Sequence, residues 1–204
     1  MKKFLSAVFL SAVFFGGALF CQTRGSRTSA FGFLYGAAGT GGAFYGSKEV
    51  NDRNTALNED DFSRIVLALS GGAALILARP LYATLAVDSI LDFHSGGTKY
   101  VNYLDFSAAL GIRAYPAYAS ALAGFFVSVE YCTGVRNDVI RLEKEEYTSS
   151  TAWGNGFRFG AAYDFSHLTR GIAPVVGAAW KHIPRGNETN DDYITVYVSL
   201  GFKI

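Results

Sequence analysis

Asp92, His94 and Ser95 come nearest to catalytic chemistry, because together they have the acid, base and nucleophile types of a hydrolytic triad. A triad is defined by its three-dimensional geometry, which residues so close in sequence rarely achieve. Residues 39–42 are glycine-rich but lack the G-x-x-x-x-G-K pattern of a phosphate-binding loop. No cluster of His, Cys, Asp or Glu shows metal-ligand spacing. The sequence therefore predicts no enzyme, no metal site and no cofactor.

A larger set of ionisable residues recurs on one face of segments in which polar and apolar residues alternate. With Lys203 near the end of the chain, its members are Arg64, Asp88, Asp105, Arg113, Glu130, Arg158, Asp164 and Lys181. Four acids and five bases inside a narrow barrel would pair with one another, because an unpaired ion in a low-dielectric interior costs several kcal/mol. Two interpretations remain open: structural ion pairs that plug a lumen, or a polar constriction that lines a narrow conduit.

These charges belong to eight segments that alternate with a period of two, which is typical of β-strands. The segments cover residues 31–46, 63–77, 81–92, 102–115, 119–131, 152–165, 172–182 and 192–203. Short turns are expected after the second, fourth and sixth segments. Long polar connections are expected at 47–62, 93–101, 132–151 and 183–191. This alternation of short and long connections is typical of an up-and-down barrel in an outer membrane.

No stretch is apolar enough for a membrane helix. The most apolar one, residues 65–78, falls short of the roughly 18 consecutive apolar residues that a spanning helix needs. A membrane-bound chain of this sequence must therefore cross with strands.

The two faces of the segments favour a membrane barrel over a soluble barrel or an antiparallel sandwich, which would alternate as well. No ionisable residue falls on the apolar face between the ends of a segment, as expected where a charge facing lipid costs about 2–4 kcal/mol. The polar face is crowded with Gly, Ala and Ser, which fits the tight interior of a narrow barrel better than a solvated exterior. The side chains predicted to contact lipid are Phe106, Leu110, Phe125, Val127, Phe159 and Val198.

The start of the chain reads as an export signal. Lys2 and Lys3 precede an uncharged apolar run, so residues 1–21 are predicted to be a secretory signal peptide and residues 22–204 one outer-membrane barrel domain. Without the leader, 16 basic and 17 acidic side chains remain, and this balance argues against nucleic-acid binding, which needs a basic surplus. Cys21 and Cys132 are too few for a disulfide scaffold.

The chain resembles the small outer-membrane barrels, and the OmpW-like family in particular, with the OmpX and OmpA transmembrane barrels as relatives. The resemblance rests on the leader, the rhythm of eight segments and the terminal segment 193–204, which is similar to the closing strand read by barrel-assembly machinery. The family usually ends in Phe, whereas Phe202 is followed here by Lys203 and Ile204.

Pattern and resemblance together predict an all-β fold, an eight-stranded antiparallel up-and-down transmembrane β-barrel, in the cell outer membrane. The resemblance implies a narrow pore or conduit for small solutes, hydrophobic ones among them. The alternative is a non-conducting, surface-exposed barrel that acts as an adhesin or structural envelope protein through its extracellular loops. Expected partners are the lipid bilayer, the barrel-assembly machinery, and small hydrophobic solutes or host ligands. The candidate contact loops are the acidic residues 51–61 and the charged residues 136–146, where a short helix is expected.

Overall fold

The computed structural model describes residues 32–78, 80–142, 145–168, 172–185 and 192–203, except for the side chains of residues 167, 192–194, 199 and 201–203. The predicted signal peptide lies outside the described residues. The described part is almost entirely β-structure. Its elements are β1 (Gly32–Tyr45), α2 (Lys48–Glu59), β2 (Ser63–Ala78), β3 (Leu81–Gly96), β4 (Lys99–Ala114), β5 (Phe125–Arg141), β6 (Tyr147–Ser150), β7 (Gly154–Asp164), the 3-10 helix η1 (Phe165–His167), β8 (Ala173–His182) and β9 (Asp192–Lys203).

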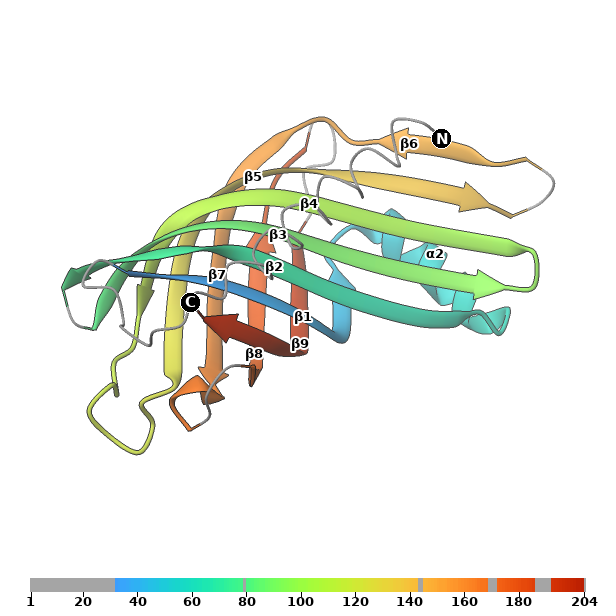
Figure 1. The fold of residues 1–204 in the computed structure, drawn as a ribbon. Coiled ribbons are helices and arrows are strands. Elements are labelled where there is room, and N and C mark those ends of the chain that lie inside the picture. Colours follow the sequence, from blue (N-terminus) through green and yellow to red (C-terminus); the bar gives the residue numbers. More distant parts are fainter. Residues whose placement is uncertain (1–31, 79, 143–144, 169–171, 186–191, 204) are drawn as a thin grey trace. The chain divides into compact units, whose positions relative to one another are not determined.

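The strands form a closed antiparallel ring. Eight of them pair in the order β4-β3-β2-β1-β9-β8-β7-β5, and a further pairing of β4 with β5 closes the ring (Figure 1). The first and last strands meet from Tyr35 opposite Lys203 to Tyr45 opposite Tyr193. Closure pairs backbone groups all round the ring, which is what a sheet needs in order to cross a bilayer. The predicted eight-stranded up-and-down transmembrane barrel is confirmed.

The short strand β6 continues the line of β7 along β5. β7 pairs with β5 between Phe125 and Gly134, and β6 pairs with it between Asn137 and Ile140. β6 and β7 thus occupy one strand position in the barrel, with an interruption at residues 151–153. The sequence pattern predicted only β7 at this position.

The fifth predicted segment, 119–131, is displaced from the strand that forms. β5 begins only at Phe125 and runs to Arg141. Residues 115–124 make successive turns instead, held by backbone hydrogen bonds such as the one that the Tyr118 N–H donates to the Tyr115 carbonyl (3.2 Å). The alternation continues through these turns, which is why the pattern placed the strand too early.

The connection predicted at 93–101 is mostly strand. β3 and β4 stay paired up to Gly96 opposite Lys99. The chain reverses at Gly97, whose φ of +60° a glycine adopts without strain. Each strand of this hairpin has 16 residues, and because a tilted strand needs only about 9–11 residues to cross a bilayer, the hairpin extends beyond the lipid.

The first long connection contains a helix rather than a solvated loop. α2 occupies most of the acidic stretch 51–61 and buries Val50, Asn54 and Leu57, which recur every three to four residues along one side. Within residues 136–146, where a short helix was the expectation, residues 136–141 belong to β5 instead, and residues 143–144 lie outside the described residues. No helix in the described part of the chain is long and apolar enough to cross a membrane.

Bulky apolar side chains lie on the outside of the ring. Leu110 is 63 % exposed, whereas its neighbour Ala109 is 4 % exposed. The exposed set on the strands includes Leu34, Ile65, Leu75, Leu85, Val87, Leu110, Ile112, Val127, Val129, Phe157, Phe159, Val196, Val198 and Leu200. Phe106 and Phe125 share the outward phase and are half-buried. A soluble barrel would reverse this arrangement, so the faces are those of a barrel in lipid.

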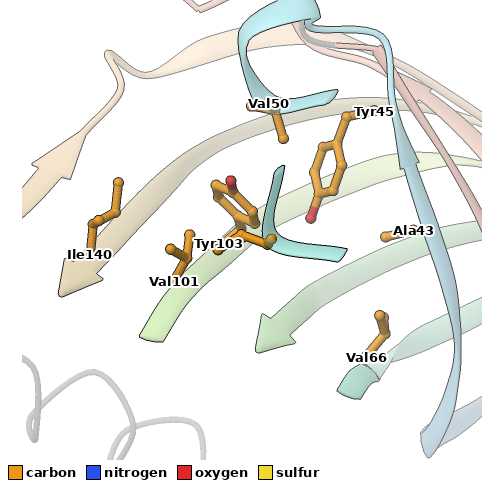
Figure 2. Close-up of a cluster of buried hydrophobic side chains, with 8 residues drawn as sticks. Ala43, Tyr45, Val50, Val66, Val101, Tyr103 and Ile140 are labelled. Carbon is orange, nitrogen blue, oxygen red and sulfur yellow. The ribbon is translucent and has the colours of Figure 1, made fainter. Parts of the chain in front are cut away.

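α2 packs against the inside of the barrel at the end that carries the long connections, called here the long-loop end. The ring centres of Tyr45 and Tyr103 lie 5.5 Å apart, and Val50 of α2 lies beside them (Figure 2). Leu57 of α2 belongs to the same buried cluster, to which β2, β4 and β5 also contribute. The helix therefore covers the inner face of the barrel mouth.

Candidate functional site: the lumen of the barrel

Side chains of eight strands, all except β6, line a cavity of about 90 Å³. Its wall is mixed in character: Tyr35, Ser128 and Tyr197 contribute hydroxyl groups, while Arg158 and Lys181 contribute positive charges. Small residues such as Gly160 and Ala179 leave the space open. Charged groups occupy four levels along the lumen, at and beyond this cavity.

Arg158 is held at the middle level by two carboxylates. It forms ion pairs with Asp88 and Glu130, and its Nε donates a hydrogen bond to Glu130 (2.5 Å). The Thr84 hydroxyl also donates to Glu130 (3.3 Å). Gly111 makes room for this carboxylate, because a Cβ at that position would lie 2.7 Å from the Glu130 Cγ. Three strands are therefore joined across the lumen by one cation.

A second ion-pair group lies nearer the long-loop end. Lys181 Nζ lies 2.5 Å from the Asp105 carboxylate and donates to the Ser107 hydroxyl (2.8 Å). Arg185 approaches the other oxygen of Asp105 to 2.6 Å. The sequence pattern missed Arg185 because it falls in a predicted loop. The signal was present, since Lys181 and Arg185 share one phase of the alternation.

A buried cluster around Asp92 lies at the mouth. Arg64 donates to both oxygens of this carboxylate (2.9 and 2.7 Å), and the Tyr45 hydroxyl donates to it at 2.9 Å. His94 Nε2 lies 3.3 Å from Asp92, and both side chains are fully buried. Ser95 is exposed on the opposite face of β3, so the three neighbours do not form a triad.

The helix α2 is tied to the rim of the barrel by charge as well as by packing. Arg53 lies over the Tyr103 ring at 5.9 Å and pairs with Asp138 of β5 at 3.9 Å. Arg136 also binds Asp138, through its Nε at 2.9 Å. These contacts link the first long connection to the outer part of β5.

Arg113 lies at the opposite, short-turn end in an aromatic environment. Its Cζ is 4.5 Å from the Tyr35 ring centre and 4.4 Å from the Phe126 ring centre. Tyr115 packs against Phe126, and Tyr82 packs against Tyr115, each with ring centres 5.5 Å apart. This end of the lumen is therefore filled by aromatic rings around one cation.

The eight residues predicted to line the lumen have different partners. Asp88, Glu130 and Arg158 meet one another, and Asp105 meets Lys181. Arg64 binds Asp92, which the pattern had not grouped with it, and Arg113 contacts aromatic rings. Asp164 accepts a hydrogen bond from the Ser166 N–H (2.8 Å) and so caps η1. The side chain of Lys203 lies outside the described residues.

Cys132 differs from its predicted place at the start of a loop. It lies within β5, is 1 % exposed and forms no disulfide. In the described ranges, no group of three His, Cys, Asp or Glu residues is placed to hold a metal ion.

The fold is similar to that of solved outer-membrane barrels. The Yersinia pestis attachment invasion locus protein Ail matches with a TM-score of 0.52 and 7 % identity, over 85 % of this chain and 99 % of that one. Neisserial surface protein A matches with a TM-score of 0.47 and 11 % identity, over 86 % and 98 % of the two chains. The outer membrane protein OprG of Pseudomonas aeruginosa matches with a TM-score of 0.36 and 13 % identity, over 86 % and 96 %. At such identities the likeness concerns the fold alone.

No family model matches the chain, and no curated protein does either. The resemblance to the OmpW-like family therefore stays a prediction.

Proposed function

We propose that this chain is a non-conducting outer-membrane barrel that presents its long-loop end at the cell surface, as an adhesive or structural envelope protein. Of the two functions predicted from the sequence, this is the second. The observation that supports it is the plugged lumen, in which Arg158 pairs with Asp88 and Glu130 while α2 covers the mouth.

The interior favours a plug over a conduit for energetic reasons. A cavity of about 90 Å³ holds only a few water molecules. A solute would have to displace Arg158 from two buried carboxylates, and breaking a buried ion pair on one side costs about 3–5 kcal/mol. A solute would also have to move α2, whose Val50 and Leu57 are buried in the mouth.

The rim of the long-loop end extends beyond the lipid and exposes its side chains. The β3–β4 hairpin and the β5–β6 pair extend past the lipid-facing band, and all four residues of β6 are exposed. The Tyr100 hydroxyl, at the tip of the hairpin, donates a hydrogen bond to Glu146 (2.5 Å). This bond raises the pKa of Tyr100. The rim therefore presents hydroxyl and charged groups to the outside.

Planar-bilayer recording of the refolded protein tests the absence of conduction. We expect no steady current from the wild type. A variant that carries Arg158→Ala and a short Gly-Ser linker in place of α2 serves as the control, because it removes both parts of the plug. A steady wild-type conductance that changes in Arg158→Ala alone would establish the conduit and overturn the proposal.

Labelling of intact cells tests the surface display. Ser149→Cys, in β6, should react with a membrane-impermeant thiol reagent, because its side chain is exposed at the rim. Ser166→Cys, in η1 at the short-turn end, is the matched control and should react only after the cells are broken. The reverse pattern would mean that the short turns face outwards.

A further inference from the structure

The connection between β4 and β5 carries no charged residue, although it is exposed. Residues 115–124 include no Asp, Glu, Lys, Arg or His. Tyr118 is 53 % exposed and Leu122 is 58 % exposed. Turns that face water usually consist of Gly, Pro, Asn, Asp and Ser, and a group of exposed bulky apolar side chains marks a contact surface. This connection therefore has the surface of a segment that contacts an apolar phase.

The connection between β7 and β8 adds exposed apolar side chains at the same end of the barrel (Figure 1). Leu168 is 68 % exposed and Ile172 is 67 % exposed. The Asp164 N–H donates a hydrogen bond to the Gly124 carbonyl (2.9 Å), which joins the two connections where β5 begins and β7 ends. The exposed apolar side chains of these two joined connections are called here the short-turn patch: Tyr118, Leu122, Leu168 and Ile172.

A hydrogen bond holds the β4–β5 connection at the outer face of the ring. The Tyr163 hydroxyl donates to the Ala121 carbonyl (3.2 Å). Tyr163 has the outward phase of β7, where it pairs in register with Val176, which is exposed on the outside of the ring. The bond thus runs from the lipid-facing side of the sheet to the connection. The short-turn patch therefore continues the surface that contacts lipid.

We propose that the short-turn patch inserts into the bilayer leaflet at that end of the barrel, with its side chains at the boundary between lipid headgroups and acyl chains. Tyrosine and aliphatic side chains together suit this boundary, because rings and methyl groups contact acyl chains while the hydroxyl reaches water. Since residues 115–124 carry no charge, they avoid the desolvation cost that a charged turn would have there. This inference requires that the barrel lies in a bilayer, but it depends neither on the plug nor on the proposed surface function.

Depth-dependent fluorescence quenching tests the insertion. The probes are Leu122→Trp and Leu168→Trp, each as the only tryptophan in a chain that also carries Trp153→Phe and Trp180→Phe, refolded into phosphatidylcholine vesicles. Lipid brominated near the headgroup should quench both probes about twofold more strongly than lipid brominated near the chain end, because interfacial side chains stay close to the headgroups. Ser149→Trp, on the exposed strand β6 at the other end, is the matched control: acrylamide should quench it, and neither brominated lipid should.

A charge introduced into the patch separates insertion from mere proximity to the membrane. With Tyr118→Trp as the probe, adding Leu122→Asp should lower quenching by the headgroup-brominated lipid about twofold, because a carboxylate is costly to place among acyl chains. Thr148→Asp adds the same charge on β6 and should leave this quenching unchanged.

Three results would overturn the proposal. The first is acrylamide quenching of Leu122→Trp equal to that of Ser149→Trp. The second is lipid quenching of Tyr118→Trp that Leu122→Asp does not change. The third is protection of Leu122→Trp from both acrylamide and brominated lipid, which would assign the patch to a contact between copies of this chain.

Discussion

Arg158 connects three strands across the proposed plug of the lumen. It joins β7 to Asp88 of β3 and Glu130 of β5, and Glu130 is itself almost completely buried. Removing the cation leaves two carboxylates without their ion-pair partner in a low-dielectric interior, where Glu130 keeps only the hydrogen bond from Thr84. The free-energy cost of removing one partner exceeds the net stabilisation that the intact ion pair provides. The reason is that the Coulomb attraction within the pair is largely offset by the cost of desolvating both charges.

Arg158→Ala is therefore expected to lower the free energy of unfolding by about 3–5 kcal/mol, measured by urea titration in detergent. Lys99→Ala is the control: the Lys99 side chain is exposed at the tip of the β3–β4 hairpin, and surface substitutions of this kind usually change stability by less than about 0.5 kcal/mol. Combining Arg158→Ala with Asp88→Asn and Glu130→Gln should restore part of the stability, because the stranded charges are then gone. A loss below about 1 kcal/mol for Arg158→Ala would contradict a structural role for these pairs.

At the scale of elements, α2 is the part that turns an open barrel end into a covered one. Its buried residues lie on one side and meet Tyr45 and Tyr103 inside the mouth. Short helices are marginal on their own, so α2 depends on this packing for its stability. The helix and the barrel mouth should therefore separate when one of these contacts is lost.

Leu57→Asp is expected to detach α2 without unfolding the barrel, because it places an unpaired carboxylate where a side chain is 3 % exposed. Limited proteolysis should then cut within residues 46–62. The barrel should still migrate faster in gel electrophoresis before heating than after, as we also expect of the wild type. Ala56→Asp, on the exposed side of the same helix, is the control and should resist cleavage. Equal cleavage of both variants would show that α2 is not held by its buried side.

At the scale of the whole molecule, the position of the apolar surface decides the environment. Exposed Leu, Val and Phe side chains recur around the outside of the ring, while acids and bases are enclosed and paired. An apolar surface of this kind is stable only in contact with lipid or with other protein. The closed ring allows lipid contact, because no strand in it needs water as a hydrogen-bond partner.

Tryptophan probes test this orientation in a background that carries Trp153→Phe and Trp180→Phe. Leu110→Trp and Val198→Trp should be quenched strongly by brominated lipid and weakly by aqueous acrylamide, because both positions are exposed on the outside of the ring. Ser149→Trp, on the exposed rim strand β6, should show the opposite preference. Acrylamide quenching at Leu110 equal to that at Ser149 would mean that the apolar face is not in lipid.

The sequence by itself determined which residues share a face, because the period of two is a local property of the extended chain. It placed Asp88, Glu130 and Arg158 on one side and Leu110, Phe159 and Val198 on the other, and the strands keep this division. It also separated short turns from long connections, although it misplaced the start of β5 and gave the β3–β4 hairpin too long a loop.

Only the tertiary structure decided which face is enclosed and which charge meets which. Alternation looks the same in a soluble and a membrane barrel, so the exposed position of Leu110 had to come from the closed ring. Asp88 and Arg158 meet across the lumen although 70 positions separate them in the chain. Arg113 packs between aromatic rings, and no salt bridge joins it to another described residue. These outcomes depend on strand register and closure, which long-range pairing establishes and no local pattern contains.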